Sequence, residues 1–309
     1  MRPLSFLYRL FVLAVLFVVV DQLTGQLILF LNSIAGDKFK REEFIRHEMK
    51  SDVVLLGSSR CAHHYVPSIF KDSLGMSAYN CGQRGNGIIY EYGRLQTIYD
   101  RYTPKLIVID FIPGDFELGD NRKFLEFLKF DYGKNNSVDS LFYRIDKFSS
   151  IKMKIQSYKY NSVLCDMLLN VVLSDRGRFN EDGYSPMYGD FPGNGDSSFR
   201  TVRQEITLDS IKLYCIKEIA SKRRENSDIV FVISPFYSQI NSEFKSILGE
   251  VAKEYDIPLL DYSYVPGISC NPIMFKDMAH LNDDGAVRFS RMVAHDLKRM
   301  GYVIGKYRQ

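Results

Sequence analysis

The sequence predicts an α/β fold with a central parallel sheet of five strands. Short β-branched runs alternate with helical stretches from Asp52 onward, which is the pattern of strands joined by crossover helices. Runs such as residues 106–109 are apolar throughout, as expected of strands that are buried on both faces. Apolar residues make up 46% of the 309 residues, so the chain can form a large core, and the formal net charge of +3 gives no indication of a nucleic-acid partner.

Local signals place the elements of this fold in order along the chain. Strands are expected at 53–56, 76–80, 106–111, 229–234 and 258–262. Helices are expected at 67–74, 88–101, 207–224, 239–255 and 283–300. The first of these helices follows Pro67, and Pro104 introduces the third strand. Ligands of such sheets collect at the carboxyl ends of the strands, so candidate site residues are sought there.

A membrane-spanning helix is expected at the N-terminus. Residues 10–20 are apolar throughout, and a second apolar stretch follows a polar patch that contains Asp21. A carboxylate is costly in a bilayer core, so the insertion is shifted or the second half is interfacial. Arg2 and Arg9 favour a cytoplasmic N-terminus and a periplasmic remainder. The alternative is a cleaved signal peptide, but the site-like residues 33–35 lie far from the apolar run, so an uncleaved single-pass anchor is expected.

The chain divides into an anchor at 1–36, a connector helix at 37–51 and a globular domain at 52–309. The connector is highly charged, and we interpret it as a solvated stalk between the membrane and the domain. Within the domain, residues 114–203 interrupt the alternation of strands and helices. Long insertions in compact folds are usually lids or binding loops, so a cap over a substrate pocket is expected; a decorative or oligomerising subdomain is the alternative.

The five cysteines are scattered and odd in number. No Cys-x-x-Cys or Cys/His spacing suggests a metal site, and neither a metal nor a cofactor is expected. Buried free thiols are the simplest interpretation. A bridge between Cys61 and Cys81 is the alternative, because both follow neighbouring strands.

Two stretches far apart in the sequence carry the candidate chemistry. Asp277 precedes His280 by three residues, so its carboxylate can accept a hydrogen bond from one ring nitrogen and leave the other free to take a proton. The Gly-Ser-Ser at residues 57–59 ends the first strand and exposes a hydroxyl beside backbone N–H groups. A serine hydroxyl is a poor nucleophile until such a base takes its proton. Both stretches follow predicted strands, so we expect them to converge.

Taken in order, these stretches resemble the SGNH (GDSL-like) hydrolase family. Leu-Gly-Ser-Ser at residues 56–59 matches the first block, in which Gly-Asp-Ser ends the first strand. The resemblance makes Ser59 the nucleophile and places Ser58 in the usual aspartate position. Residues 275–282 closely match the fifth block, which supplies the catalytic acid and histidine. The resemblance therefore implies a Ser-His-Asp triad.

The second and third blocks concern the oxyanion hole. Asn-x-Gly-x-x-Gly matches residues 80–85, and the resemblance makes the N–H groups of Ser59 and Gly85 oxyanion donors. Family members end the third strand with Gly-x-Asn-Asp, whose Asn is a further donor, whereas this chain has Gly114 at that position. The third donor is missing or comes from elsewhere, from Arg60, Asn86 or the insertion. Loss of one donor lowers the rate by about 10²–10³-fold, which implies slow or specialised chemistry.

The resemblance covers roughly residues 52–115 and 228–300 and implies a flavodoxin-like three-layer α/β/α fold. In layout the chain is similar to membrane-anchored envelope members, such as the D-alanine transfer protein and the acetyltransferase-like proteins of exopolysaccharide assembly. The implied activity is that of a serine esterase or O-acyltransferase on acyl esters of cell-envelope glycans. The alternative is a non-catalytic glycan-binding or scaffold protein of an envelope acylation system. A third interpretation makes the chain a structural partner of a membrane acyltransferase.

Six further side chains are candidates for contacting the substrate: Arg60, His63, His64, Asn86, Asp115 and Tyr184. The two histidines follow the nucleophile by one helical turn, the arginine can position an anionic group, and the tyrosine can stack on a sugar. Structural roles are the alternatives: filling a helix turn, pairing with a carboxylate or packing in a loop. Asp110, which lies in the third strand, is expected to be structural.

Overall fold

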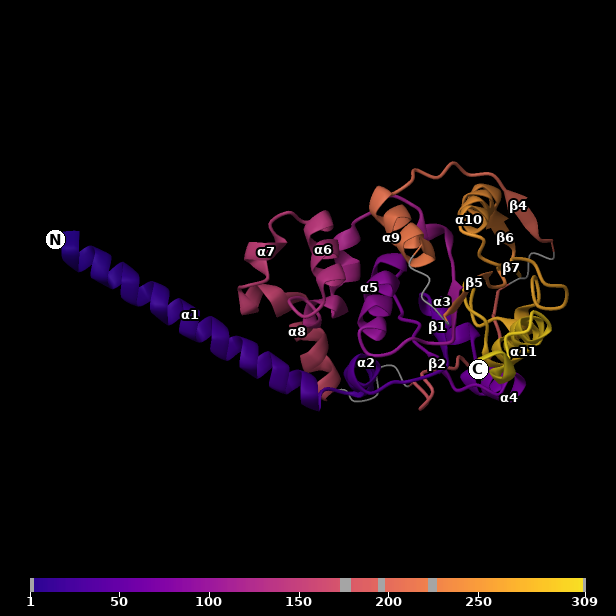
Figure 1. Cartoon of the computed structure of the whole chain (residues 1–309), viewed down its shortest axis with the longest axis horizontal. Coiled ribbons are helices and arrows are strands. Elements are labelled where there is room, and N and C mark those ends of the chain that lie inside the picture. The colour runs from indigo at the N-terminus through magenta and orange to yellow at the C-terminus, as the bar shows by residue number, and fades with distance from the viewer. Residues whose placement is uncertain (1–2, 173–178, 194–197, 222–226, 308–309) are drawn as a thin grey trace.

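The computed structural model describes residues 3–172, 179–193, 198–221 and 227–307 (Figure 1). A parallel sheet of five strands lies at the centre of the domain, in the order β2-β1-β3-β5-β7. Its strands are β1 (Val53–Leu56), β2 (Ala78–Asn80), β3 (Leu106–Asp110), β5 (Asp228–Ile233) and β7 (Leu259–Asp261). The predicted α/β fold with a central parallel sheet of five strands is therefore confirmed.

Helices pack on the sheet through two apolar cores. Alternate strand residues enter different cores: Val54 and Ile107 enter one, and Val53 and Leu106 enter the other, all fully buried. The first core includes side chains of α5 (Ile88–Tyr99), α9 (Ser210–Ser221) and α10 (Ser242–Glu254). The second includes side chains of α3 (Ser59–His64), α4 (Pro67–Leu74) and α11 (Asp283–Arg299).

A small parallel sheet of β4 (Arg200–Val202) and β6 (Gln239–Asn241) lies beside the main one. The predicted helix at 239–255 was wrong in its first turn, because residues 239–241 pair with β4 and the Asn241 side chain caps α10 by accepting a hydrogen bond from the Glu243 N–H, at 3.0 Å. The helix that follows therefore starts at Ser242.

Six helices lie in the described part of the chain between β3 and β4. They are η1 (Pro113–Asp115), η2 (Asn121–Leu125), η3 (Phe127–Phe130), α6 (Asn136–Ile145), α7 (Ser149–Lys152) and α8 (Gln156–Val172). Of these, α6 packs against α5, and α8 packs against the N-terminal helix. Parts of the predicted cap, residues 173–178 and 194–197, lie outside the described residues. The remaining short helices are η4 (Pro272–Met274) and η5 (Ile304–Tyr307).

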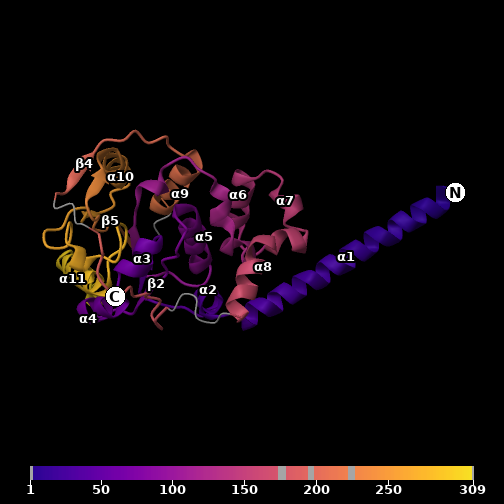
Figure 2. The same cartoon turned by 180° about the vertical axis from the view of Figure 1, so that it is seen from behind.

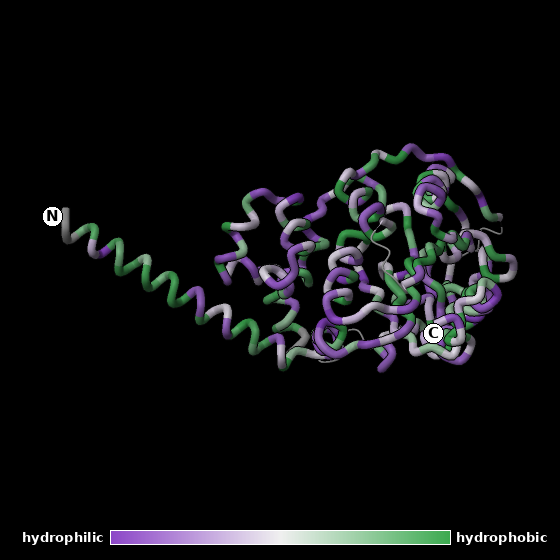
Figure 3. The backbone as a smooth tube through the Cα atoms, viewed as in Figure 1, coloured by the Kyte–Doolittle hydropathy of each residue, from purple (hydrophilic) through white to green (hydrophobic). Residues whose placement is uncertain are grey.

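The N-terminal helix α1 (Pro3–Ile34) is continuous and projects from the body (Figure 2). Its part from Phe6 to Ile34 is long and apolar enough to cross a membrane, and Figure 3 shows the run of hydrophobic residues along it. Asp21 is buried at the contact with α8, where its carboxylate accepts hydrogen bonds from the backbone N–H groups of Gln156 and Ser157, at 2.7 and 2.9 Å. The charged patch inside α1 is therefore a cap for α8.

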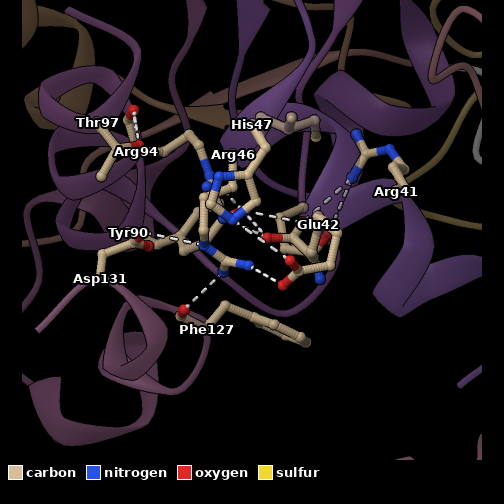
Figure 4. A network of polar contacts seen from close by, with 12 residues as sticks. Arg41, Glu42, Arg46, His47, Tyr90, Arg94, Thr97, Phe127 and Asp131 are labelled. Atoms are coloured by element: carbon tan, nitrogen blue, oxygen red, sulfur yellow. Dashed lines mark hydrogen bonds and ion pairs between the residues drawn. The ribbon is translucent and has the colours of Figure 1, made fainter. Parts of the chain in front are cut away.

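The connector helix α2 (Asp37–His47) is not the solvated stalk that its charge pattern predicted. Phe39 and Ile45 are buried in the core, and Glu42 is buried against Arg94 of α5 (Figure 4). The Tyr90 hydroxyl also donates a hydrogen bond to Glu42, at 2.9 Å. The prediction failed because the charges of α2 find opposite charges on other elements, which a charge count along one helix does not reveal.

Candidate active site

The two predicted stretches converge at the carboxyl edge of the sheet. Ser59 begins α3 directly after β1, and its hydroxyl donates a hydrogen bond to Nε2 of His280, at 2.9 Å. Nδ1 of the same ring donates to the carboxylate of Asp277, 3.0 Å from each oxygen. The geometry is that of a nucleophile, a base and a group that orients the base. The catalytic roles of the three residues stay a prediction.

A tight turn, rather than a helix, presents His280. Asp277 accepts hydrogen bonds from the backbone N–H groups of Ala279 and His280, at 2.8 and 2.9 Å. Burial acts to raise the pKa of Asp277, but the hydrogen bonds from the His280 ring and from these N–H groups outweigh it, and the pKa lies below its usual value. The carboxylate is therefore ionised at neutral pH, which favours the ring tautomer with the proton on Nδ1.

Arg60 and His64, two of the predicted substrate contacts, hold this turn in place. The buried Arg60 guanidinium donates hydrogen bonds to the Ala279 carbonyl, at 3.1 Å, and to the carbonyls of Ser234 and Pro235, at 2.8 and 2.6 Å. The fully buried His64 ring accepts a hydrogen bond from the Leu281 N–H at Nε2, at 3.0 Å. Hydrogen bonds from Arg60 and His64 thus fix the backbone on both sides of His280, at Ala279 and Leu281. The structure therefore gives Arg60 and His64 a positioning role.

Ser234 and Asp110 connect this support to the sheet. The Ser234 hydroxyl, at the end of β5, accepts a hydrogen bond from Nε of Arg60, at 3.1 Å, and donates one to Asp110, at 3.0 Å. Asp110 also accepts from the Tyr65 hydroxyl, at 2.8 Å, and is buried, in agreement with its predicted structural role. Ser234 was not among the predicted site residues, although a polar residue directly after the apolar run of a central strand was a usable signal.

His63 lies beside His280. Its ring is edge-on to that of His280, with the centroids 5.3 Å apart, and its Nδ1 donates a hydrogen bond to the Ser185 carbonyl, at 2.6 Å. Burial lowers the pKa of His63 to about 4, although the hydrogen bond to Ser185 acts in the opposite direction. The ring is therefore neutral at pH 7 and connects α3 to the segment that follows α8.

Acid should destabilise the protein partly through His63. The unfolded chain binds a proton at this residue below its ordinary value of 6.5, whereas the folded protein does so only below about 4. The free energy of unfolding should fall by up to about 3 kcal/mol as the pH drops through this window. His63→Asn keeps a donor for the Ser185 carbonyl, so its unfolding free energy should fall less steeply in denaturant titrations from pH 7 to 4.5. Equal slopes would contradict this expectation.

The loop that carries the predicted oxyanion donor is also held from behind. Arg41 of α2 donates hydrogen bonds to the carbonyls of Asn80 and Gly82, at 2.6 and 3.0 Å. A Cβ on Gly82 would lie 2.4 Å from the Ala62 nitrogen, so only glycine allows this approach to α3. Gly85 is exposed with φ +75, and no residue in the described ranges accepts a hydrogen bond from its N–H group. That donor is free for a ligand.

Two predicted substrate contacts, Asp115 and Tyr184, have structural roles instead. Both carboxylate oxygens of the buried Asp115 accept backbone hydrogen bonds, from Ile88 at the start of α5 and from Ile112, at 3.0 Å each. The Tyr184 hydroxyl donates a hydrogen bond to Asp283, at 2.8 Å. The side chain is buried, so its ring has no open face for stacking on a sugar. Both predictions were wrong, because Asp115 accepts a hydrogen bond from an otherwise unpaired backbone N–H group at the start of α5 and the Tyr184 hydroxyl bonds to Asp283.

Asn86 keeps the features of a ligand contact. Its side-chain oxygen is buried and has no hydrogen-bond partner in the part of the chain that the structure describes. Gly114 lies in η1 and supplies no side-chain donor. The third oxyanion donor at Asn86 stays a prediction, which requires the amide to turn its NH₂ group to where its oxygen now lies.

A cavity of about 420 Å³ adjoins the turn that presents His280, and Arg60, Met278 and Ala279 form one side of it. The rest of its lining comes from Ile112, Pro113, Glu117, Val202, Gln204, Phe236, Tyr237, Ser238, Gln239, Ile240 and Asn241. The sequence did not predict this wall, because residues 239–241 were expected to be helical. A larger cavity of about 810 Å³ lies among α6, α7 and α9. Neither cavity is lined by Ser59, Asp277 or His280, but only the smaller of the two includes residues adjacent to them in sequence, Arg60, Met278 and Ala279.

All five cysteines are free thiols. Cys61 and Cys81 are buried and free rather than bridged, and Cys165 is exposed, contrary to the expectation of burial. Among the residues with described positions, no cluster of three or more His, Cys, Asp or Glu side chains has the geometry to hold a metal ion.

Comparison with known proteins does not assign the chain to a family. No protein-family model matches it. Part of the chain is similar to the DNA mismatch repair protein Msh3 of Dictyostelium discoideum, with 26% identity over 140 residues. This match covers 43% of the chain and spans only 9% of the length of that protein. A similarity of this extent shows no shared family.

Proposed function

We propose that the protein is a membrane-anchored serine esterase or O-acyltransferase of the SGNH type. The observation that carries the proposal is the hydrogen bond of 2.9 Å from the Ser59 hydroxyl to His280, continued to Asp277. The strand order of the sheet is the order of flavodoxin-like sheets, and helices pack on both of its faces, which supports the three-layer arrangement that the resemblance implies.

The mechanism is a two-step acyl transfer. His280 takes the proton of Ser59 as the hydroxyl oxygen attacks an ester carbonyl, and the ionised Asp277 stabilises the resulting imidazolium. The tetrahedral oxyanion binds to the backbone N–H groups of Ser59 and Gly85, with Asn86 as the candidate third donor. His280 then gives its proton to the leaving alcohol. Water or a sugar hydroxyl, deprotonated by the same ring, takes the acyl group from Ser59, and this acceptor decides between esterase and transferase.

The proposed substrates are acyl esters of cell-envelope glycans. The cavity beside the turn that presents His280 is lined by the half-buried ring of Phe236 and by the exposed side-chain amides of Gln204 and Gln239, and this combination suits sugar rings and their hydroxyl groups. Anchoring by α1, with the domain outside the cytoplasm, fits such substrates. A membrane acyltransferase is the proposed protein partner.

A non-catalytic glycan-binding or scaffold protein is the second candidate function. The observation that favours it is Gly114, which stands where the family has its third oxyanion donor. The intact hydrogen-bond relay of Ser59, His280 and Asp277 favours the enzyme, because a protein without catalysis has no need of this geometry.

Labelling with a fluorophosphonate tests the proposal. The full chain should be used in detergent, because the second half of α1 packs against the domain. The wild type should react covalently, and Ser59→Ala should lose both the label and at least about 10³-fold of its 4-nitrophenyl acetate hydrolysis. Ser58→Ala is the matched control and should keep the label. A folded wild type that labels no better than Ser59→Ala would favour the scaffold.

A further inference from the structure

The body of the protein meets the projecting half of α1 at α7 and the start of α8. Because Asp21 caps the first turn of α8, the start of α8 lies level with Asp21 along α1. In both views α7 lies on the side of the body that faces the N-terminal end of α1 (Figures 1 and 2). This part of the domain is therefore the closest to whatever surrounds the projecting helix.

The exposure of α1 changes at Asp21. Side chains 6–20 are all exposed, whereas from Asp21 onward every third or fourth residue is buried: Asp21, Gly25, Ile28, Asn32 and Ala35. Residues 3–20 span about 27 Å at 1.5 Å per residue, close to the thickness of a hydrocarbon core of about 30 Å. Arg9 lies about 9 Å along the helix from the start of this stretch, so its long side chain can extend to the headgroups on the N-terminal side. A span that ends at residue 20 places Asp21 and the start of α8 at the membrane surface rather than inside it.

The side chains at this level are those of a membrane-interface contact. Phe148 and Ile151 are 67% and 63% exposed, although both are large and apolar. Residues 142–159 carry five basic side chains and one acidic one, and that acid, Asp146, is paired with Lys152 at 2.6 Å. Exposed apolar side chains with unneutralised lysines suit the headgroup region of a bilayer that contains anionic lipid.

We propose that the α7 surface, defined as Lys147, Phe148, Ile151 and Lys154, rests on the membrane. Phe148 and Ile151 enter the headgroup region, and the two exposed lysines face lipid phosphates. Continuity with the exposed apolar part of α1 and the excess of positive charge favour lipid over a protein partner. The proposal rests on the membrane anchoring proposed above and adds a second contact, which sets the orientation of the domain.

The absence of tryptophan from the sequence allows a direct test. Phe148→Trp introduces a single indole into the full chain, which is then reconstituted in vesicles of phosphatidylcholine with about 30 mol % phosphatidylglycerol. Vesicles with brominated acyl chains should quench its emission at least about twofold relative to unbrominated ones. Phe17→Trp reports the insertion of α1, and Tyr188→Trp, at a position that is 70% exposed next to α11, is the aqueous control.

The outcomes separate the two proposals. Quenching at positions 17 and 148, but not at 188, supports the α7 surface. Quenching at position 17 alone, with Ile151→Trp also unquenched, would overturn the proposed membrane contact of the α7 surface. It would leave the proposed insertion of α1 intact. No quenching at 17 would overturn both proposals. Lys147→Glu combined with Lys154→Glu should at least halve the quenching of Phe148→Trp, and unchanged quenching would overturn the role of the lysines.

Discussion

Replacing His280 with alanine should lower kcat for ester hydrolysis by about 10⁴–10⁶-fold, because Ser59 then has no base within hydrogen-bond distance. Asp277→Asn should lower kcat by about 10³–10⁴-fold, because an amide favours the wrong ring tautomer. Single-turnover kinetics with 4-nitrophenyl acetate measure both effects, and circular dichroism shows whether the variants are folded.

A histidine outside the site serves as the control for this prediction. His295 is exposed on α11, and His295→Ala should keep the wild-type rate. The double variant Ser59→Ala with His280→Ala should be no slower than either single variant, because residues that act as one unit show strongly non-additive effects. If His280→Ala kept about a tenth of the activity or more, the relay would not be the catalytic device.

Glu42→Gln should destabilise the protein by about 3–5 kcal/mol, which is the expected effect of removing one partner from a buried ion pair. Arg94 is fully buried and pairs with Glu42, and Arg41 lies 3.5 Å from the same carboxylate. Burial raises the pKa of Glu42, but the positive charges around it outweigh this effect and hold the pKa below its usual value. The neutral glutamine would therefore leave buried guanidinium groups without a counter-charge.

Thermal unfolding in detergent, followed by circular dichroism, measures this loss, and a fall in Tm of about 10 °C is expected. Glu48→Gln removes an exposed carboxylate from the end of the same helix and should change the free energy of unfolding by less than about 0.5 kcal/mol. Equal melting of the two variants would show that the buried network contributes no net stability.

Local patterns were enough to predict the sheet and the relay. Each predicted strand lies within two residues of an observed one, because apolar runs bounded by polar or breaking residues leave little choice of position. Ser59, Asp277 and His280 were found because a turn and a three-residue spacing fix their geometry locally. The topology of the sheet then brings Ser59, which follows β1, close to the turn that contains Asp277 and His280.

The remaining features depend on partners that are distant in the sequence. Asp115 and Tyr184 were predicted as ligand contacts. In the structure Asp115 accepts a hydrogen bond from the start of α5, and Tyr184 donates one to Asp283. The burial of α2 depends on Arg94 and Asp131, which lie on other elements. Polar side chains at a sheet edge therefore predict where a site lies more reliably than which of them face the ligand.

The join between α1 and α2 has a consequence for which substrates the protein can reach. Only Ala35 and Gly36 separate the two helices. Arg41 of α2 donates hydrogen bonds to the loop that carries Gly85. In the proposed membrane-anchored enzyme, no flexible linker therefore separates the anchor from the nucleophile, and Ser59 would stand at a fixed height above the bilayer. A long, flexible polymer can bring an ester to that height, whereas a lipid whose ester lies among the acyl chains cannot. The proposed enzyme would therefore select substrates partly by whether their ester can reach Ser59.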